Sequence, residues 1–148
     1  MSDSTRTRRR FLEMVGGACA ASLAGCSSSA ASPATIGDVA AGNVSALSVG
    51  TLEPVASQPV CIGRDAGGVY AMTLTCTHQG CDIANGGTVS FAMIRCPCHG
   101  SEFDANGNVV RGPAMAPLIH YAVSQDTAGN LTIHGGTEVS ESTRLAVA

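Results

Sequence analysis

Two short stretches decide how this chain is interpreted: Cys76–Cys81 has the sequence CTHQGC, and Cys96–Ser101 has the sequence CPCHGS. Each stretch begins with Cys, carries a His two or three residues later, and then has a Gly followed by a Cys or a Ser. Thiolate and imidazole groups are the ligands that proteins offer to zinc and to iron–sulfur clusters. The pairing of the two stretches therefore predicts a metal centre held by two loops of the chain.

The four candidate ligands are Cys76, His78, Cys96 and His99. Two Cys and two His suit a 2Fe–2S cluster that has both imidazoles on one iron, and this ligand set raises the reduction potential above that of a four-Cys cluster. On these residues the chain resembles the Rieske iron–sulfur family, whose pattern is Cys-x-His, a gap, and Cys-x-x-His. The resemblance implies one Rieske-type 2Fe–2S cluster, with the thiolates on the buried iron and the imidazoles on the outer iron.

Two further cysteines, Cys81 and Cys98, stand where the disulfide-bearing members of the family carry one extra Cys in each loop. The resemblance implies a disulfide between them, and two free thiols are the alternative. Supporting roles follow for three more residues of the loops. Glycines at 80 and 100 would let backbone N–H groups approach the cluster sulfurs, and the hydroxyl at 101 would donate a hydrogen bond to a bridging sulfide, which raises the potential. These residues are Gly80, Gly100 and Ser101.

Three positions depart from the family pattern. Phe103 stands where high-potential relatives usually carry a Tyr, and it cannot donate a hydrogen bond, so we expect a potential below the top of the Rieske range. The sequence GPAMAP, which begins with Gly112 and Pro113, resembles the loop that shields the cluster, with Met115 in place of its second Pro. Gln79 replaces the Leu that quinol-oxidising relatives commonly have, which weakens the case for a quinol site.

Short apolar runs separated by Gly, Asn and Asp predict β-strands along the rest of the chain. No window after the leader sustains the apolar spacing of a helix. We therefore expect an all-β fold, a Rieske-type antiparallel β-sandwich or barrel, with a small cluster-binding subdomain at about 76–117. The expected strands cover residues 44–49, 59–64, 69–74, 89–95, 108–111, 118–124 and 130–134.

The composition indicates a small acidic domain with an aliphatic core. The chain has 148 residues, 45% of them hydrophobic but only 3% aromatic, so Val, Ile, Leu, Ala and Met must fill the core. From Cys26 onward there are four Arg, no Lys and nine Asp or Glu, a formal charge of 4 − 9 = −5. An acidic domain has no electrostatic reason to bind nucleic acid, so we expect no such partner.

The N-terminal residues resemble an export signal. The run Arg8–Arg10 precedes Phe-Leu as in a twin-arginine signal, and the sequence LAGC ending at Cys26 resembles a lipoprotein processing site. Lipidation at Cys26 would tether the protein to a membrane, whereas an ordinary charged signal and an uncleaved N-terminal anchor are the alternatives. The expected order is a signal peptide at 1–26, a flexible tether at 27–43, a Rieske domain at 44–140 and a C-terminal tail at 141–148.

Zinc is the other metal that these four ligands suit. Two Cys and two His can also bind zinc tetrahedrally, but zinc does not call for the second Cys pair, the Ser and the Gly-Pro loop together. Cys61 is expected to be a buried apolar Cys, and Cys19 belongs to the signal. His120 and His134 fall in strand patterns, where we expect surface or hydrogen-bonded side chains.

The function expected from these features is electron transfer by an exported, membrane-tethered Rieske protein. It would pass single electrons in a respiratory or periplasmic chain, at the outer face of a bacterial membrane or in the periplasm. Two other roles stay open: the iron–sulfur subunit of a quinol-oxidising cytochrome bc complex, and the small subunit of a periplasmic molybdenum oxidase of the arsenite oxidase kind. The expected partners are redox proteins (cytochrome b or c, or an oxidase large subunit) and, in the second role, quinol. A Rieske oxygenase is not expected, because the chain has no room for its catalytic domain.

Overall fold

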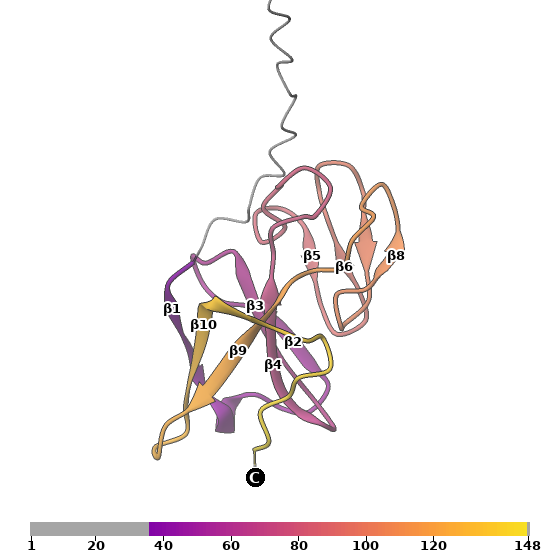
Figure 1. The fold of residues 1–148 in the computed structure, drawn as a ribbon. Coiled ribbons are helices and arrows are strands. Elements are labelled where there is room, and N and C mark those ends of the chain that lie inside the picture. Colours follow the sequence, from indigo (N-terminus) through magenta and orange to yellow (C-terminus); the bar gives the residue numbers. More distant parts are fainter. Residues whose placement is uncertain (1–35, 148) are drawn as a thin grey trace, which may run out of the picture. The chain divides into compact units, whose positions relative to one another are not determined.

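Two antiparallel sheets make up residues 36–147, the part of the chain that the computed structural model describes (Figure 1). The larger sheet has six strands in the order β1-β10-β9-β4-β3-β2, and the smaller has four in the order β5-β6-β7-β8. Within these residues no helix is long and apolar enough to cross a membrane. The expected all-β class with a small second subdomain is confirmed, while the export signal and Cys26 lie outside the described residues.

The larger sheet combines strands from the N-terminal and the C-terminal part of the described residues. Its first four strands come before the metal-ligand motifs and its last two come after them, so the chain leaves β4, builds the small sheet and returns to β9 (Figure 1). Every pairing within the larger sheet is antiparallel. Its strands are β1 (Asp38–Asn43), β2 (Thr51–Pro54), β3 (Val60–Asp65), β4 (Gly68–Thr73), β9 (His120–Gln125) and β10 (Asn130–Val139).

The smaller sheet consists of very short strands, two between the motifs and two after the second motif. Residues 89–95 were expected as one strand, but Ser90 and Met93 exchange backbone hydrogen bonds of 3.1 and 3.2 Å and turn this segment into a hairpin. Few backbone hydrogen bonds join strands this short, so the small sheet relies on packing against the larger sheet. Its strands are β5 (Thr88–Val89), β6 (Ile94–Arg95), β7 (Glu102–Phe103) and β8 (Val109–Arg111).

The central strands β3 and β4 are buried on both faces. Along β3, Val60 and Ile62 pack into a cluster with β9 and β10, whereas Cys61 packs into a second cluster with the small sheet. Along β4, Val69 and Ala71 likewise face the first cluster, and Tyr70 and Met72 face the second. Burial on two sides explains why these strands read as continuous apolar runs rather than as an alternating pattern.

The structure corrects two boundaries at the start of the domain. Residues 38–43, expected within the tether, form β1 and pair with β10. Val44–Ala46, expected to begin a strand, forms a short 3-10 helix, because the Asn43 side chain accepts a hydrogen bond from the Ser45 N–H at 3.0 Å and caps the turn. The folded domain thus starts before residue 44.

The C-terminal residues pack back on the domain. Leu145 and Val69 exchange backbone hydrogen bonds of 2.8 and 2.9 Å. The Arg144 side chain donates to the Asp65 carboxylate at 2.7 Å and lies 4.1 Å from the centre of the Tyr70 ring. Residues 141–147, expected as a tail, therefore cover the β3–β4 hairpin.

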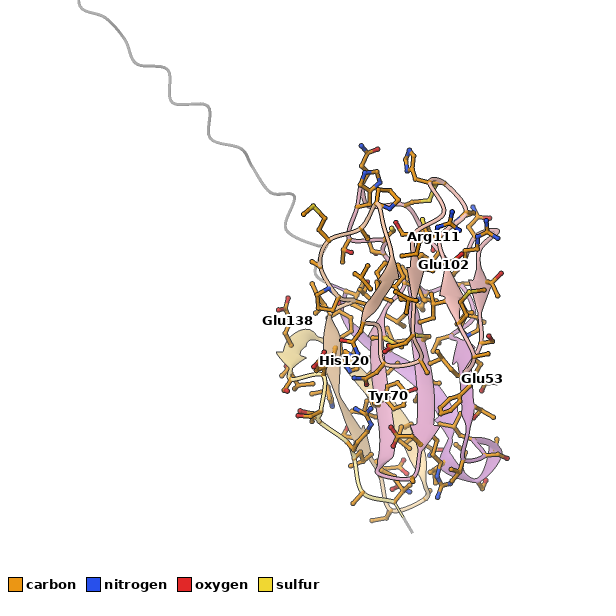
Figure 2. All side chains as sticks on the ribbon, turned by 90° about the vertical axis from the view of Figure 1, so that its right-hand side faces the viewer. Glu53, Tyr70, Glu102, Arg111, His120 and Glu138 are labelled. Carbon is orange, nitrogen blue, oxygen red and sulfur yellow. A yellow bond between two sulfur atoms is a disulfide. The ribbon has the colours of Figure 1, made fainter. Side chains whose placement is uncertain are left out.

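A polar cluster beside this segment ties the loop between β7 and β8 to the larger sheet. Tyr70 donates its hydroxyl proton to the Ala105 carbonyl at 2.9 Å, and Nε2 of His120 lies 2.9 Å from the Asn106 carbonyl. Arg144 donates to the Asn106 side chain at 2.7 Å. Tyr70 and His120 lie close together at the middle of the sheet (Figure 2), with ring centres 6.0 Å apart. The small sheet is thus positioned by side chains of the large one.

His120 is expected to make stability depend on pH. Its ring is buried, its Nδ1 has no hydrogen-bond partner, and burial lowers its pKa below 6.5, with Arg144 adding to this and the Asn106 carbonyl, Glu141 and Asp104 opposing it. Because the unfolded chain then binds more protons than the folded one, the free energy of unfolding should fall as the pH drops below about 6.5. Urea denaturation should show a smaller fall between pH 7 and pH 5 in His120→Gln. Equal falls in both proteins would contradict this.

Candidate metal centre

The two motif loops have the same backbone geometry. In both Cys76–Cys81 and Cys96–Ser101 the N–H of the first Cys donates to the carbonyl of the last residue, at 2.8 and 2.9 Å. In both, the N–H of the fifth residue donates to the carbonyl of the first Cys, at 2.8 and 3.2 Å. That fifth residue is Gly80 or Gly100, with φ of 71° and 74°, a left-handed conformation that favours glycine. The shared Cys…Gly spacing in the sequence therefore produces two equivalent turns.

A disulfide between Cys81 and Cys98 joins the loops, with an S–S distance of 1.93 Å. The sulfur of Cys96 lies within 4.8 Å of both bridged sulfurs. This trio resembles a metal-binding group by distance alone, but disulfide sulfurs have no thiolate to offer a metal. Because Cys81 and Cys98 are bridged, Cys96 is the cysteine of the second loop that remains as a candidate ligand.

Cys76 and Cys96 are unbridged thiols at the inner side of the loops, 2% and 1% exposed. Burial raises the pKa of the Cys76 thiol, and the neighbouring Cys96 thiol raises it further. The backbone N–H of His78 and the hydroxyl of Ser101 oppose this rise by donating to the Cys76 sulfur. Two buried thiols, of which Cys76 has donors aimed at its sulfur, are suited to bind metal as thiolates.

Each loop also contributes one imidazole, from His78 and from His99. Their rings meet edge to face, with centres 4.8 Å apart. Nδ1 of His78 is buried and has no hydrogen-bond partner. A buried imidazole nitrogen without a partner costs free energy unless it binds something, and coordination to iron would satisfy it. Two thiols, two imidazoles and one orphaned nitrogen therefore fit a Rieske-type cluster.

The Gly-Pro loop is attached to both motif loops. The Ala114 N–H donates to the Ser101 hydroxyl at 3.0 Å, and the Thr77 hydroxyl donates to the Ala116 carbonyl at 2.7 Å. Ser101 therefore accepts one hydrogen bond and keeps its own proton for the Cys76 sulfur. Met115 is 95% exposed at the tip of this loop. Thr77 was missed by the sequence reasoning, although its place between two candidate ligands was a usable signal.

The remaining candidates differ in burial. Phe103 is fully buried in the same apolar cluster as Cys76 and Cys96, whereas Gln79 is exposed. Gly112 and Pro113 are exposed at the start of the Gly-Pro loop and are joined by a cis peptide bond. Two further side chains, one in the core and one on the surface, lie where the sequence predicted them. Cys61 is buried in the core, which raises its thiol pKa to about 12, and His134 bonds to Ser124 and Asp38 on the surface.

These features define a small β protein in which paired loops hold an iron–sulfur cluster. The sequence model of the Rieske [2Fe-2S] domain matches residues 37–122, and the chain belongs to this family. It is thus an electron-transfer protein, and its cofactor is one Rieske 2Fe–2S cluster, a group that takes up and releases one electron at a time.

Curated relatives include two proteins called cytochrome b6-f complex iron-sulfur subunit. The one from Synechococcus sp. (strain WH7803) is 53% identical over 57 residues, which are 38% of this chain and 30% of the relative. The one from Parasynechococcus marenigrum (strain WH8102) is 51% identical over the same shares. The chain thus matches less than a third of the length of these relatives.

Two of the solved structures that match this chain are Rieske proteins. The plasma membrane Rieske protein PetC3 from Synechocystis PCC 6803 is 33% identical, with a TM-score of 0.47, and the match covers 64% of this chain and 97% of that one. The quaternary ammonium Rieske monooxygenase CntA matches at 17% identity with a TM-score of 0.51, over 68% of this chain and 32% of that one. At this identity the second likeness concerns the fold alone.

Ser101→Ala is expected to lower the reduction potential. The Ser101 hydroxyl donates toward the Cys76 sulfur, and such a bond stabilises the added negative charge of the reduced state. We expect a fall of about 60 mV, equivalent to a tenfold change for a one-electron couple. A redox titration followed by EPR measures it, with Ser90→Ala, in the β5–β6 turn, as the control. An unchanged or raised potential in Ser101→Ala would contradict the assigned role.

Proposed function

We propose that Cys76, His78, Cys96 and His99 are the cluster ligands and that the protein carries single electrons between redox partners. The observation that supports this most is the pair of equivalent loops, which are joined by a disulfide and carry two buried thiols and two imidazole rings that meet edge to face. The thiols sit in the apolar core, and the His99 ring is exposed. The exposed imidazole is where electrons would enter and leave.

A redox titration of the purified holo-protein, followed by EPR, tests this role. A Rieske signal with a clearly positive potential supports transfer within a quinol or high-potential chain. A well-negative potential would indicate a ferredoxin-like carrier instead. Absence of a 2Fe–2S signal in protein purified without oxygen would refute the ligand set.

We also propose that the protein is exported and tethered to the outer face of a bacterial membrane, through a signal at 1–26, lipidation at Cys26 and a tether that ends before β1. The Cys81–Cys98 disulfide supports export, because disulfides persist in oxidising compartments and are rare in the cytosol. The twin-arginine route exports folded proteins, which suits a domain that receives its cluster before export. Mass spectrometry of the native N-terminus would show either a lipidated Cys26 or a different start.

A second candidate is the iron–sulfur subunit of a quinol-oxidising cytochrome complex. It is favoured by the curated relatives, whose names place them in cytochrome b6-f complexes. The exposed polar side chain of Gln79 at the loop tip counts against it. Purification from solubilised native membranes separates the two, since a complex subunit would co-purify with cytochrome b and a free carrier would not.

A further inference from the structure

A groove runs beside the second motif loop. It has a volume of about 640 Å³ and opens between the β5 end of the small sheet and the loop that carries His99. Glycines form much of its wall, and a Cβ on Gly87 would clash with the carbonyl oxygens of Ile83 and Arg95. The close backbone contact requires glycine at position 87, and the exposed His99 lines the same groove. Its lining includes Gly86, Gly87, Arg95, Cys98, His99 and Arg111.

A row of charges lies along this groove. Arg95, Glu102 and Arg111 are opposite one another on β6, β7 and β8, so their side chains share one face of the small sheet. Figure 2 shows Glu102 and Arg111 near each other on that sheet. Both guanidinium groups approach the same carboxylate oxygen, at 3.8 and 3.6 Å, and their side chains are 55% and 70% exposed. The single Glu102 carboxylate thus neutralises one of the two guanidinium groups, and the three side chains together carry a net charge of +1.

This positive row contrasts with the rest of the described domain. Residues 36–147 contain four Arg and nine Asp or Glu, a formal charge of 4 − 9 = −5. Of the other two arginines, Arg144 is bound to Asp65 and covers Tyr70, and Arg64 donates to the Leu47 carbonyl on the large sheet. The groove therefore combines an exposed candidate ligand with cations on a domain that is otherwise acidic.

We propose that this groove is the docking site of an acidic electron-transfer protein, which presents paired carboxylates to Arg95 and Arg111. The proposal rests on the assignment of His99 as a cluster ligand. An acidic partner is repelled by most of the domain and attracted at the groove, so its productive orientation is selected electrostatically. Docking there would place the partner against His99, the exposed candidate ligand of the cluster.

The test uses one redox protein in two charge forms: native cytochrome c, which is rich in lysine, and succinylated cytochrome c, in which the lysines carry carboxylates. Reduced holo-protein is mixed with each form at low ionic strength, and haem reduction is followed by stopped flow. Arg111→Gln should slow electron transfer to the succinylated form about fivefold, because one exposed cation is lost at the contact. It should not slow transfer to the native form.

Arg64→Gln is the matched control, since it removes the same charge from the large sheet. It should change the rate with succinylated cytochrome c by less than about twofold. Equal slowing by Arg64→Gln and Arg111→Gln would show that only net charge matters and would overturn the docking site. Wild-type protein that carries no cluster would instead refute the proposed function, so the two failures are distinguishable.

A second measurement does not depend on electron transfer. Zinc-substituted, succinylated cytochrome c is redox-inert, and its addition should shift the backbone amide NMR signals of Gly86, Gly87 and Thr88 on the groove wall. These shifts should weaken in Arg111→Gln and persist in Arg64→Gln. Shifts confined to the large sheet would overturn the proposal.

Discussion

Cys96→Ala is expected to abolish the cluster while the β-sheets still form. Cys96 is one of two unbridged thiols at the inner side of the loops. If Cys76 and Cys96 are the thiolate ligands, as we propose, its removal would leave the inner iron with one protein thiolate. The visible absorption and the EPR signal of a 2Fe–2S centre should disappear, and bound iron should fall from two atoms per chain to almost none. Iron analysis with far-UV circular dichroism measures both parts of this prediction.

Cys61→Ala is the matched control for this loss. Cys61 is also an unbridged, fully buried thiol, and it packs in the same apolar cluster as Cys96. Its side chain lies on β3 and hydrogen-bonds the Met72 carbonyl, away from both loops. Cys61→Ala should keep a full complement of iron. Retention of the cluster in Cys96→Ala, or its loss in Cys61→Ala, would contradict the ligand assignment.

Removing the disulfide with Cys81→Ser and Cys98→Ser together is expected to cost about 3 kcal/mol of unfolding free energy. The bridge joins residues 17 apart in sequence, and closing a loop of this size restricts the unfolded chain by about that amount. Within the described residues, the two loops would also lose the disulfide cross-link between their side chains. Urea denaturation under anaerobic conditions should show the lower midpoint, and cluster absorbance should decay faster.

The double variant is preferable to either single one, because a single change leaves a free thiol within reach of the Cys96 sulfur. Chemical reduction of the wild-type disulfide offers an independent check, since it opens the bridge without altering the sequence. Both treatments should give similar losses of stability. An unchanged urea midpoint after each would mean that the bridge does not constrain the chain.

The all-β class and the two-loop centre were predictable because each rests on a local pattern. The equivalent turns follow from Cys and Gly at fixed spacing, and the continuous apolar runs of β3 and β4 identify strands without any knowledge of partners. The boundaries were less predictable. The sequence DVAAGN of β1 has weak strand propensity, and it becomes a strand only through pairing with β10.

Contacts between distant parts of the chain could not be predicted from one sequence. Arg144 lies 79 residues from Asp65, and nothing in either neighbourhood indicates that they meet. The Arg95–Glu102–Arg111 row depends on the register of three very short strands. A slip of one residue would move these side chains to the opposite face, and the sequence does not specify that register.

Because β3 and β4 are buried on both faces, we expect the two apolar clusters to unfold together. A protein with separate cores can unfold one part while the other stays intact, but here the same two strands complete both apolar clusters. We expect the slowest amide hydrogen exchange on β3 and β4, with exchange there reporting global unfolding. The thiols at positions 76 and 96 belong to one of those clusters, so the lifetime of the cofactor should follow the cooperativity of the entire domain.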